Sequence, residues 1–138
     1  MPLIENVFGA NNIEKMNSVL VGFVNKASHL HSAVISTTDG FCLGSTETSD
    51  KSKEKLAAMS GSIYSLAKSI SNEISGDGCD MLTLESGPKK IIWCTIQSKK
   101  FTLVMAFISE DNKLLGELLF SAKECCKLIQ SILDGDQS

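Results

Sequence analysis

Residues 101–108 read FTLVMAFI, a segment that is apolar at nearly every position. A strand with one face in solvent alternates apolar and polar side chains, whereas a strand that is apolar throughout has both faces covered. We therefore expect this segment to lie centrally in a sheet that carries helices on both sides. The fold class that follows is α+β, with one sheet between two helical layers.

Two further strand-like runs, residues 80–85 and 90–96, precede this segment. Gly87-Pro88 separates the two runs, and four residues separate the second run from the segment at 101. Connections this short join antiparallel neighbours, so the three runs form a meander. The first run has only one sequence neighbour and is therefore expected at a sheet edge. Since only Asp80 and Glu85 flank it, the sequence favours pairing of this edge with another chain, and we predict a homodimer.

The remaining elements follow from periodicity and turn residues. They are a helix over residues 11–30, a β-hairpin of strands 33–37 and 41–45 around Thr38-Asp39-Gly40, a helix to about Ser75, and a helix from about residue 115 that ends at Gly135. Asn11 and Glu14 resemble a capping box, Ser49 or Asp50 would cap the second helix, and Asp111 or Asn112 would cap the third. The predicted order is α-β-β-α-β-β-β-α.

The second helix carries two kinds of side chain outside its charged start. One is an apolar stripe that is sufficient to pack the helix on the sheet, formed by Leu56, Met59, Ile63, Leu66, Ile70 and Ile74. The other is a set of small residues on adjoining ridges, which would let another helix approach closely: Ala57, Ala58, Gly61, Ser62, Ser65 and Ser69. A solvent-facing row of small residues is the alternative interpretation. The presence of Gly61 favours the interpretation that another helix contacts this row.

Charge excludes one class of partner. The formal net charge is -3, and the 13 positive residues are all lysines. Nucleic-acid recognition relies on a basic face, usually with arginine, so no nucleic-acid partner is expected. A chain without arginine also cannot supply an arginine finger to a GTPase.

Catalytic, metal and cofactor sites are not expected either. The five cysteines are odd in number and form no CxxC pair, which is typical of free thiols. His29 and His31 lack a third ligand nearby, and no residue pair has the spacing of nucleophile and base. The sequence has no signal peptide and no apolar run that could insert in a membrane, so we expect a cytoplasmic, non-enzymatic protein.

Several segments together resemble the roadblock/dynein light chain family, notably its bacterial and archaeal members. The likeness covers residues 11–133 and is carried by three stretches: the hairpin AVISTTDGFCLGS at 33–45, the helix opening KLAAMS at 55–60, and the passage from Phe101 to Leu119. The domain is accordingly placed at residues 11–134, between an N-terminal arm at 1–10 and a tail at 135–138. The resemblance implies a profilin-like sheet of five strands.

The same resemblance implies dimerisation through the third strand and the second helix, and docking of a small Ras-like GTPase on the paired second helices. On this sequence, the implied dimer contacts are Ala58, Gly61, Ser62, Tyr64, Ser65, Met81, Leu82, Thr83 and Leu84. The implied GTPase contacts are Ala57, Gly61, Tyr64 and Lys68. The alternative is a profilin-like or PAS-like sensory domain that binds a small molecule between sheet and helix.

Overall fold

The computed structural model describes residues 8–26, 31–46, 49–110 and 115–135. Its helices are α2 (Ala10–Lys26), α3 (Asp50–Ile74) and α4 (Leu115–Leu133). Its strands are β1 (Ser32–Thr37), β2 (Cys42–Ser45), β3 (Met81–Ser86), β4 (Lys89–Gln97) and β5 (Thr102–Ser109). This order of elements is the predicted α-β-β-α-β-β-β-α.

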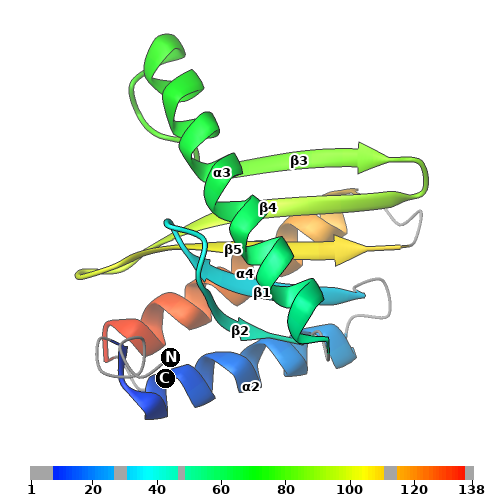
Figure 1. Ribbon diagram of the computed structural model, residues 1–138, viewed down its shortest axis with the longest axis vertical. Coiled ribbons are helices and arrows are strands. Elements are labelled where there is room, and N and C mark those ends of the chain that lie inside the picture. The colour runs from blue at the N-terminus through cyan, green and yellow to red at the C-terminus, as the bar shows by residue number, and fades with distance from the viewer. Residues whose placement is uncertain (1–7, 27–30, 47–48, 111–114, 136–138) are drawn as a thin grey trace.

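One antiparallel sheet with the strand order β2-β1-β5-β4-β3 forms the middle layer (Figure 1). The all-apolar strand β5 lies at its centre, between β1 and β4, as its composition predicts. β3 lies at one edge, which confirms the edge predicted for it, and β2 lies at the other. The fold is α+β and profilin-like.

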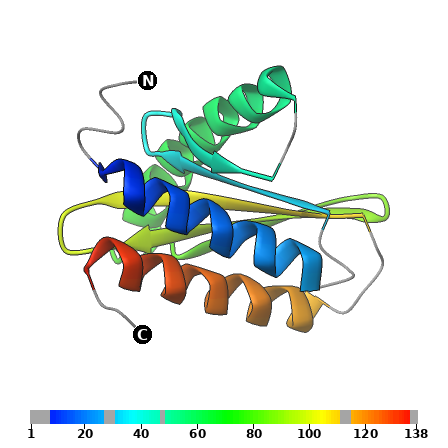
Figure 2. The ribbon, with the colours of Figure 1, turned by 90° about the horizontal axis from the view of Figure 1, so that it is seen from below.

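Helices cover both faces of the sheet. α2 and α4 lie side by side on one face, and α3 crosses the other face (Figure 2). The larger core lies under α2 and α4, where Met16, Leu20 and Ile129 meet Ile35 and Phe107. A smaller cluster of Trp93, Val104 and Ala106 lies under α3. Each face of β5 therefore contributes to a different core.

Local signals explain most element boundaries. Ser49 caps α3, because its hydroxyl accepts a hydrogen bond of 3.3 Å from the amide of Ser52. α2 already begins at Ala10, so Asn11 lies inside the helix and the predicted capping box is wrong. The predicted caps of α4, Asp111 and Asn112, and most of the N-terminal arm lie outside the described residues.

No helix of the described chain is long and apolar enough to span a membrane.

Helix α3 does not pack along its whole length. Its first half lies over β1, β2 and β5, and its second half continues past β3 and beyond the edge of the sheet (Figure 1). The prediction that one apolar stripe packs this helix on the sheet is wrong in both halves, because Met59 in the first half is 46% exposed and the residues that α3 buries are Ala57, Ser60, Gly61 and Ser71. Ile63 does face the cluster around Trp93. Leu56 is partly buried, and the other stripe residues are exposed.

Candidate functional site

The overhanging half of α3 exposes large apolar side chains. Leu66 is 59%, Ile70 is 52% and Ile74 is 79% exposed. They follow one another at steps of four residues, so they lie on one side of the helix. Burying such side chains stabilises a protein by about 1.5–3 kcal/mol each, which makes their exposure on a single chain informative.

The edge strand β3 adds to the same apolar surface. Leu82 and Leu84 are exposed, and in the ladder they lie opposite Trp93 and Ile91, which belong to the cluster under α3. The two leucines are therefore on the α3 side of the sheet. We call the five residues the α3–β3 surface: Leu66, Ile70, Ile74, Leu82 and Leu84.

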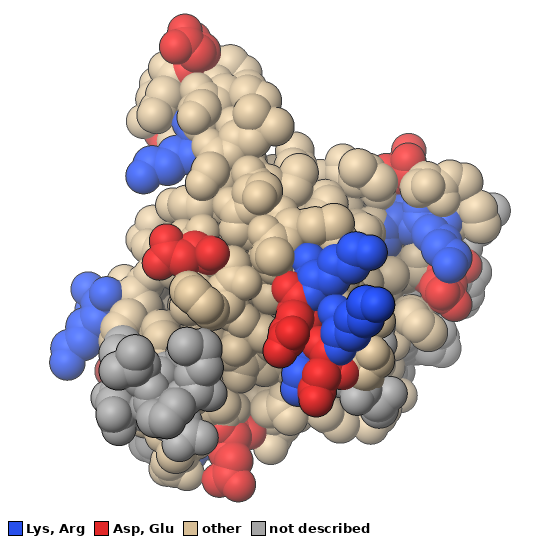
Figure 3. Space-filling view, viewed as in Figure 1, with Lys and Arg blue, Asp and Glu red and all other residues tan. Residues whose placement is uncertain are grey.

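Charge is almost absent from this part of α3. The first six residues of the helix include five charged side chains, whereas residues 56–74 include only Lys68 and Glu73. Figure 3 shows charged atoms gathered over the N-terminal end of α3, then mostly uncharged surface with isolated charged groups toward the far end of the helix. A helix that faces water normally carries Lys and Glu on its outer side, so this face has the composition of one that meets protein.

The two edges of the sheet differ in their protection. β2 has four residues, its ladder with β1 is irregular at Ile35/Ser36, and the amide of Ser45 donates to Oδ1 of Asn17 at 3.0 Å. Shortness, a bulge and a covering helix are three devices that keep an edge from pairing with another chain. β3 has six residues in regular register with β4, and no described helix lies along its outer side. Among the described strands, β3 alone presents an edge that is open to a further strand.

The small residues of α3 face a different neighbour from the one expected. Ala57 and Gly61 are buried beneath the helix, where the turn between β1 and β2 passes. A Cβ atom on Gly61 would lie 2.8 Å from the amide nitrogen of Gly40 and 3.1 Å from the carbonyl oxygen of Thr38. The close approach that the sequence predicted is therefore made by the hairpin of the same chain. Ala57 is fully buried, and Gly61 is buried at the floor of a groove between α3 and the hairpin turn.

The other predicted contact residues remain near or at the surface. Ala58, Ser62 and Ser65 line a shallow groove between α3 and the hairpin turn, together with Ser69 and Asp39. Lys68 is exposed.

Tyr64 of α3 lies close to residues of β3 at the α3–β3 surface. Tyr64 is partly buried against Trp93 and lines, with Met81 and Leu82, a hollow of only about 20 Å³. Thr83 is partly buried and Leu84 is exposed.

Four residues of the stripe that was predicted to pack on the sheet are exposed instead: Met59, Leu66, Ile70 and Ile74. Their periodicity marks an apolar face but does not say what covers it.

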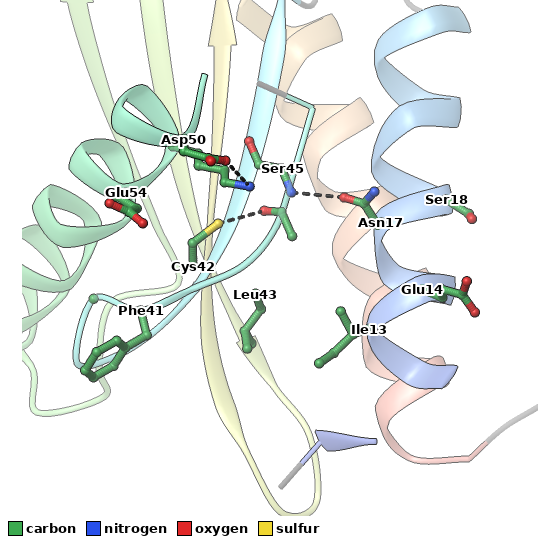
Figure 4. Close-up of a pocket in the computed structure, with 13 residues that line it drawn as sticks. Ile13, Glu14, Asn17, Ser18, Phe41, Cys42, Leu43, Ser45, Asp50 and Glu54 are labelled. Carbon is green, nitrogen blue, oxygen red and sulfur yellow. Dashed lines mark hydrogen bonds and ion pairs between the residues drawn. The ribbon is translucent and has the colours of Figure 1, made fainter. Parts of the chain in front are cut away.

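A separate cleft of about 960 Å³ lies beside β2, between α2 and the start of α3 (Figure 4). Ile13 and Leu43 line it, and the ion pair between Asp50 and Lys53, 3.0 Å long, lies on the α3 side. Cys42 faces it with a thiol whose pKa is raised by burial. A nucleophilic thiolate is not favoured there.

The remaining cysteines and acids form no reactive centre in the described residues. All five cysteines are free, as their spacing predicts. Burial raises the pKa of Cys125 to about 12, and a hydrogen bond to Cys94 together with burial raises the pKa of Cys126. Within the described ranges, no three His, Cys, Asp or Glu side chains converge to hold a metal ion.

The layers, the strand order and the open β3 edge define a class of small α+β domains with profilin-like architecture. The family model of the Roadblock/LC7 domain matches residues 16–107. The chain therefore belongs to the Roadblock/LC7 domain family, whose members are regulatory and adaptor domains.

Solved structures agree with this assignment at the level of the fold. The Roadblock/LC7 domain from Streptomyces avermitilis is 20% identical, with a TM-score of 0.72 over 84% of this chain and 92% of that one. MglB from Myxococcus xanthus is 13% identical, with a TM-score of 0.79 over 91% of this chain and 92% of that one. A chain of the LokiProfilin1/rabbit actin complex is 15% identical, with a TM-score of 0.53 over 86% of this chain and 96% of that one. No curated protein sequence matches the chain.

Proposed function

We propose that this protein is a non-enzymatic homodimeric adaptor that binds a small Ras-like GTPase on its paired α3 helices. The observation that carries the proposal is the α3–β3 surface, which is apolar, nearly free of charge and adjacent to an open strand edge. A second copy that pairs its β3 with this β3 would extend the sheet beneath the overhanging half of α3. Leu66, Ile70 and Ile74 would then be covered chiefly by the α3 helix of the second copy, because the side of α3 that faces the sheet carries Ala57, Ser60, Gly61 and Ser71.

The GTPase would meet the side of α3 that self-association leaves open. That side is the groove lined by Ser62, Ser65 and Ser69, which also reaches Leu66 of the α3–β3 surface, and Lys68 lies three residues beyond Ser65. Small hydroxyl side chains there would let a partner approach the helix backbone closely. Tyr64 would contribute from the edge between the two surfaces.

Any effect on GTP hydrolysis would be indirect. The chain has no arginine, so it has no guanidinium to stabilise charge on the transferred phosphoryl group. The adaptor would act by recognising one nucleotide state or by repositioning residues of the GTPase itself.

The test is capture from a lysate of the source cell on immobilised protein, once with a non-hydrolysable GTP analogue and once with GDP. We expect a small GTPase to be retained in one nucleotide state and lost with Ser65→Arg, which fills the groove. Gln130→Arg adds the same side chain to an exposed position on α4 and should leave capture unchanged. Absence of a GTPase in both nucleotide states would contradict this function.

The cleft beside β2 supports a second candidate, a sensory domain with a small-molecule ligand. The predicted site for that function was the space between sheet and helix, but the hollow beneath α3 measures only about 20 Å³. The cleft of about 960 Å³ has room, and Glu14, Asp50 and Glu54 would favour a cationic ligand. A screen of cationic metabolites for a rise in melting temperature, repeated with Glu54→Gln, tests this candidate.

A further inference from the structure

The direction of the backbone groups of β3 follows from one hydrogen bond. The amide of Thr95 donates to the carbonyl oxygen of Asp80 at 3.0 Å, so the backbone groups of Asp80 point toward β4. In a strand, the N–H and C=O of one residue share a side and successive residues alternate. Leu82 and Leu84 therefore bond to β4, as their ladder positions require, whereas Met81, Thr83 and Glu85 direct their backbone groups to the open edge.

This alternation restricts how two copies of β3 can pair across a two-fold axis. Antiparallel partners exchange hydrogen bonds only where both residues direct their backbone groups at each other. An axis between two residues would place every outward residue opposite an inward one, and no hydrogen bond would form. The axis must therefore pass through a residue.

The axis can pass through any residue of the strand, and these positions are not equivalent. With the axis on Thr83, Met81 pairs with Glu85 of the second copy, Thr83 with Thr83, and Glu85 with Met81. Each of these three pairs exchanges two hydrogen bonds. An axis on Leu82 or on Leu84 leaves only two such pairs within the strand, and an axis on Met81 or on Glu85 leaves only one.

The side chains favour the same position of the axis. With the axis on Thr83, each Leu82 lies opposite Leu84 of the second copy, in non-hydrogen-bonded pairs whose side chains approach most closely. These leucines are on the α3 side, where the overhanging helices would cover them. An axis on Leu82 instead places Leu84 opposite Asp80, and an axis on Leu84 places Leu82 opposite Ser86. In each alternative, one leucine lies opposite its own copy and the two pairs of Leu82 with Leu84 are lost.

One outward group already has a local partner. The thiol of Cys79 donates to the carbonyl oxygen of Met81 at 3.4 Å. A thiol is a weak donor, so the amide of Glu85 from the second copy would replace it with a stronger hydrogen bond. Occupation of this carbonyl therefore does not oppose the pairing.

We infer that β3 of this protein pairs with β3 of a second copy in a single register, with Thr83 on the two-fold axis and Leu82 opposite Leu84. The inference rests on the proposed self-association and adds to it the residues that set its geometry. Thr83 of one chain would lie opposite Thr83 of the second copy.

Disulfide cross-linking of variants with a single added cysteine tests the register directly. In the inferred register, the two Cα atoms of residue 83 lie about 5.5 Å apart, within the range of about 4.4–6.8 Å that a disulfide spans. The two Cα atoms of residue 82, or of residue 84, are offset by two residues along the strands and lie about 8 Å apart. We therefore expect oxidised glutathione to cross-link Thr83→Cys about tenfold more than Leu82→Cys or Leu84→Cys.

Two controls accompany the cross-linking. Wild-type protein, treated in the same way, measures the background from the five native thiols. Sedimentation of every variant under reducing conditions shows whether it forms a dimer before oxidation, and a mixture of Leu82→Cys with Leu84→Cys should cross-link as a heterodimer.

The outcomes separate the register from the self-association. Preferential cross-linking of Thr83→Cys, together with the mixed pair, supports the inferred register. A dimer that cross-links best through Leu82→Cys or Leu84→Cys overturns the register and leaves the proposed function intact. A dimer in which none of these cysteines cross-links overturns the strand pairing itself. Variants and wild type that sediment as monomers overturn both the register and the homodimer.

Discussion

Gly61 holds α3 against the hairpin, and replacing it with alanine tests that packing. The added Cβ would lie 2.8 and 2.9 Å from the nitrogen and Cα of Gly40 and 3.1 Å from the carbonyl oxygen of Thr38. All three are backbone atoms, so no side chain can rotate away. Overpacking of this kind costs about 1–3 kcal/mol, and the gain in helix propensity returns about 1 kcal/mol. We expect Gly61→Ala to lower the free energy of unfolding by up to about 2 kcal/mol.

The matched control is Gly22→Ala in α2, because a Cβ atom at Gly22 would meet nothing within 4 Å. There only the propensity gain applies, and we expect stabilisation by about 1 kcal/mol. The assay is thermal or urea unfolding at one protein concentration, where each kcal/mol shifts the melting temperature by about 3–5 °C. The packing argument is refuted if Gly61→Ala stabilises the protein as much as Gly22→Ala does.

Two further predictions concern buried side chains. Ser60→Ala removes the hydroxyl oxygen that accepts a hydrogen bond of 3.2 Å from the indole N–H of Trp93, and we expect it to lower the free energy of unfolding by about 1–3 kcal/mol. The assay is urea unfolding followed by the fluorescence of this single tryptophan. Ser62→Ala, at an exposed position, should stay within about 0.5 kcal/mol of wild type. Burial raises the pKa of Cys125 to about 12. Iodoacetamide at pH 8 should therefore leave Cys125 unmodified in the native protein and modify it after unfolding. Modification of Cys125 as fast as that of the partly exposed Cys79 would contradict this burial.

The sequence predicted the layers because strand burial has a strong local signature. Residues 101–108 are apolar on both sides of the strand, which requires two covering layers and a central position. The short loops of the meander then placed β3 at an edge. The pairing of β1 with β5 joins segments about 70 residues apart in the chain, and no local pattern indicates it.

The packing of α3 was less predictable because the helix packs on the sheet mainly through small residues. Periodicity identified an apolar face, but it did not show that most of this face would be exposed. Ile63 is partly buried against the cluster of Trp93, whereas Met59 and Ile74 are exposed. Small residues raise the same ambiguity, since Gly61 marks a close approach without identifying the neighbour. The Asp39-Gly40 turn supplied that neighbour.

Self-association through the α3–β3 surface is the central claim, and sedimentation equilibrium tests it most directly. We expect wild-type protein at micromolar concentration to have twice the 14.9 kDa mass of one chain. Ile70→Asp places a charge in the surface and should give the mass of one chain, whereas Leu128→Asp, at a comparably exposed position on α4, should remain dimeric. A single-chain mass for wild type, or a dimer that Ile70→Asp leaves intact, would contradict the claim.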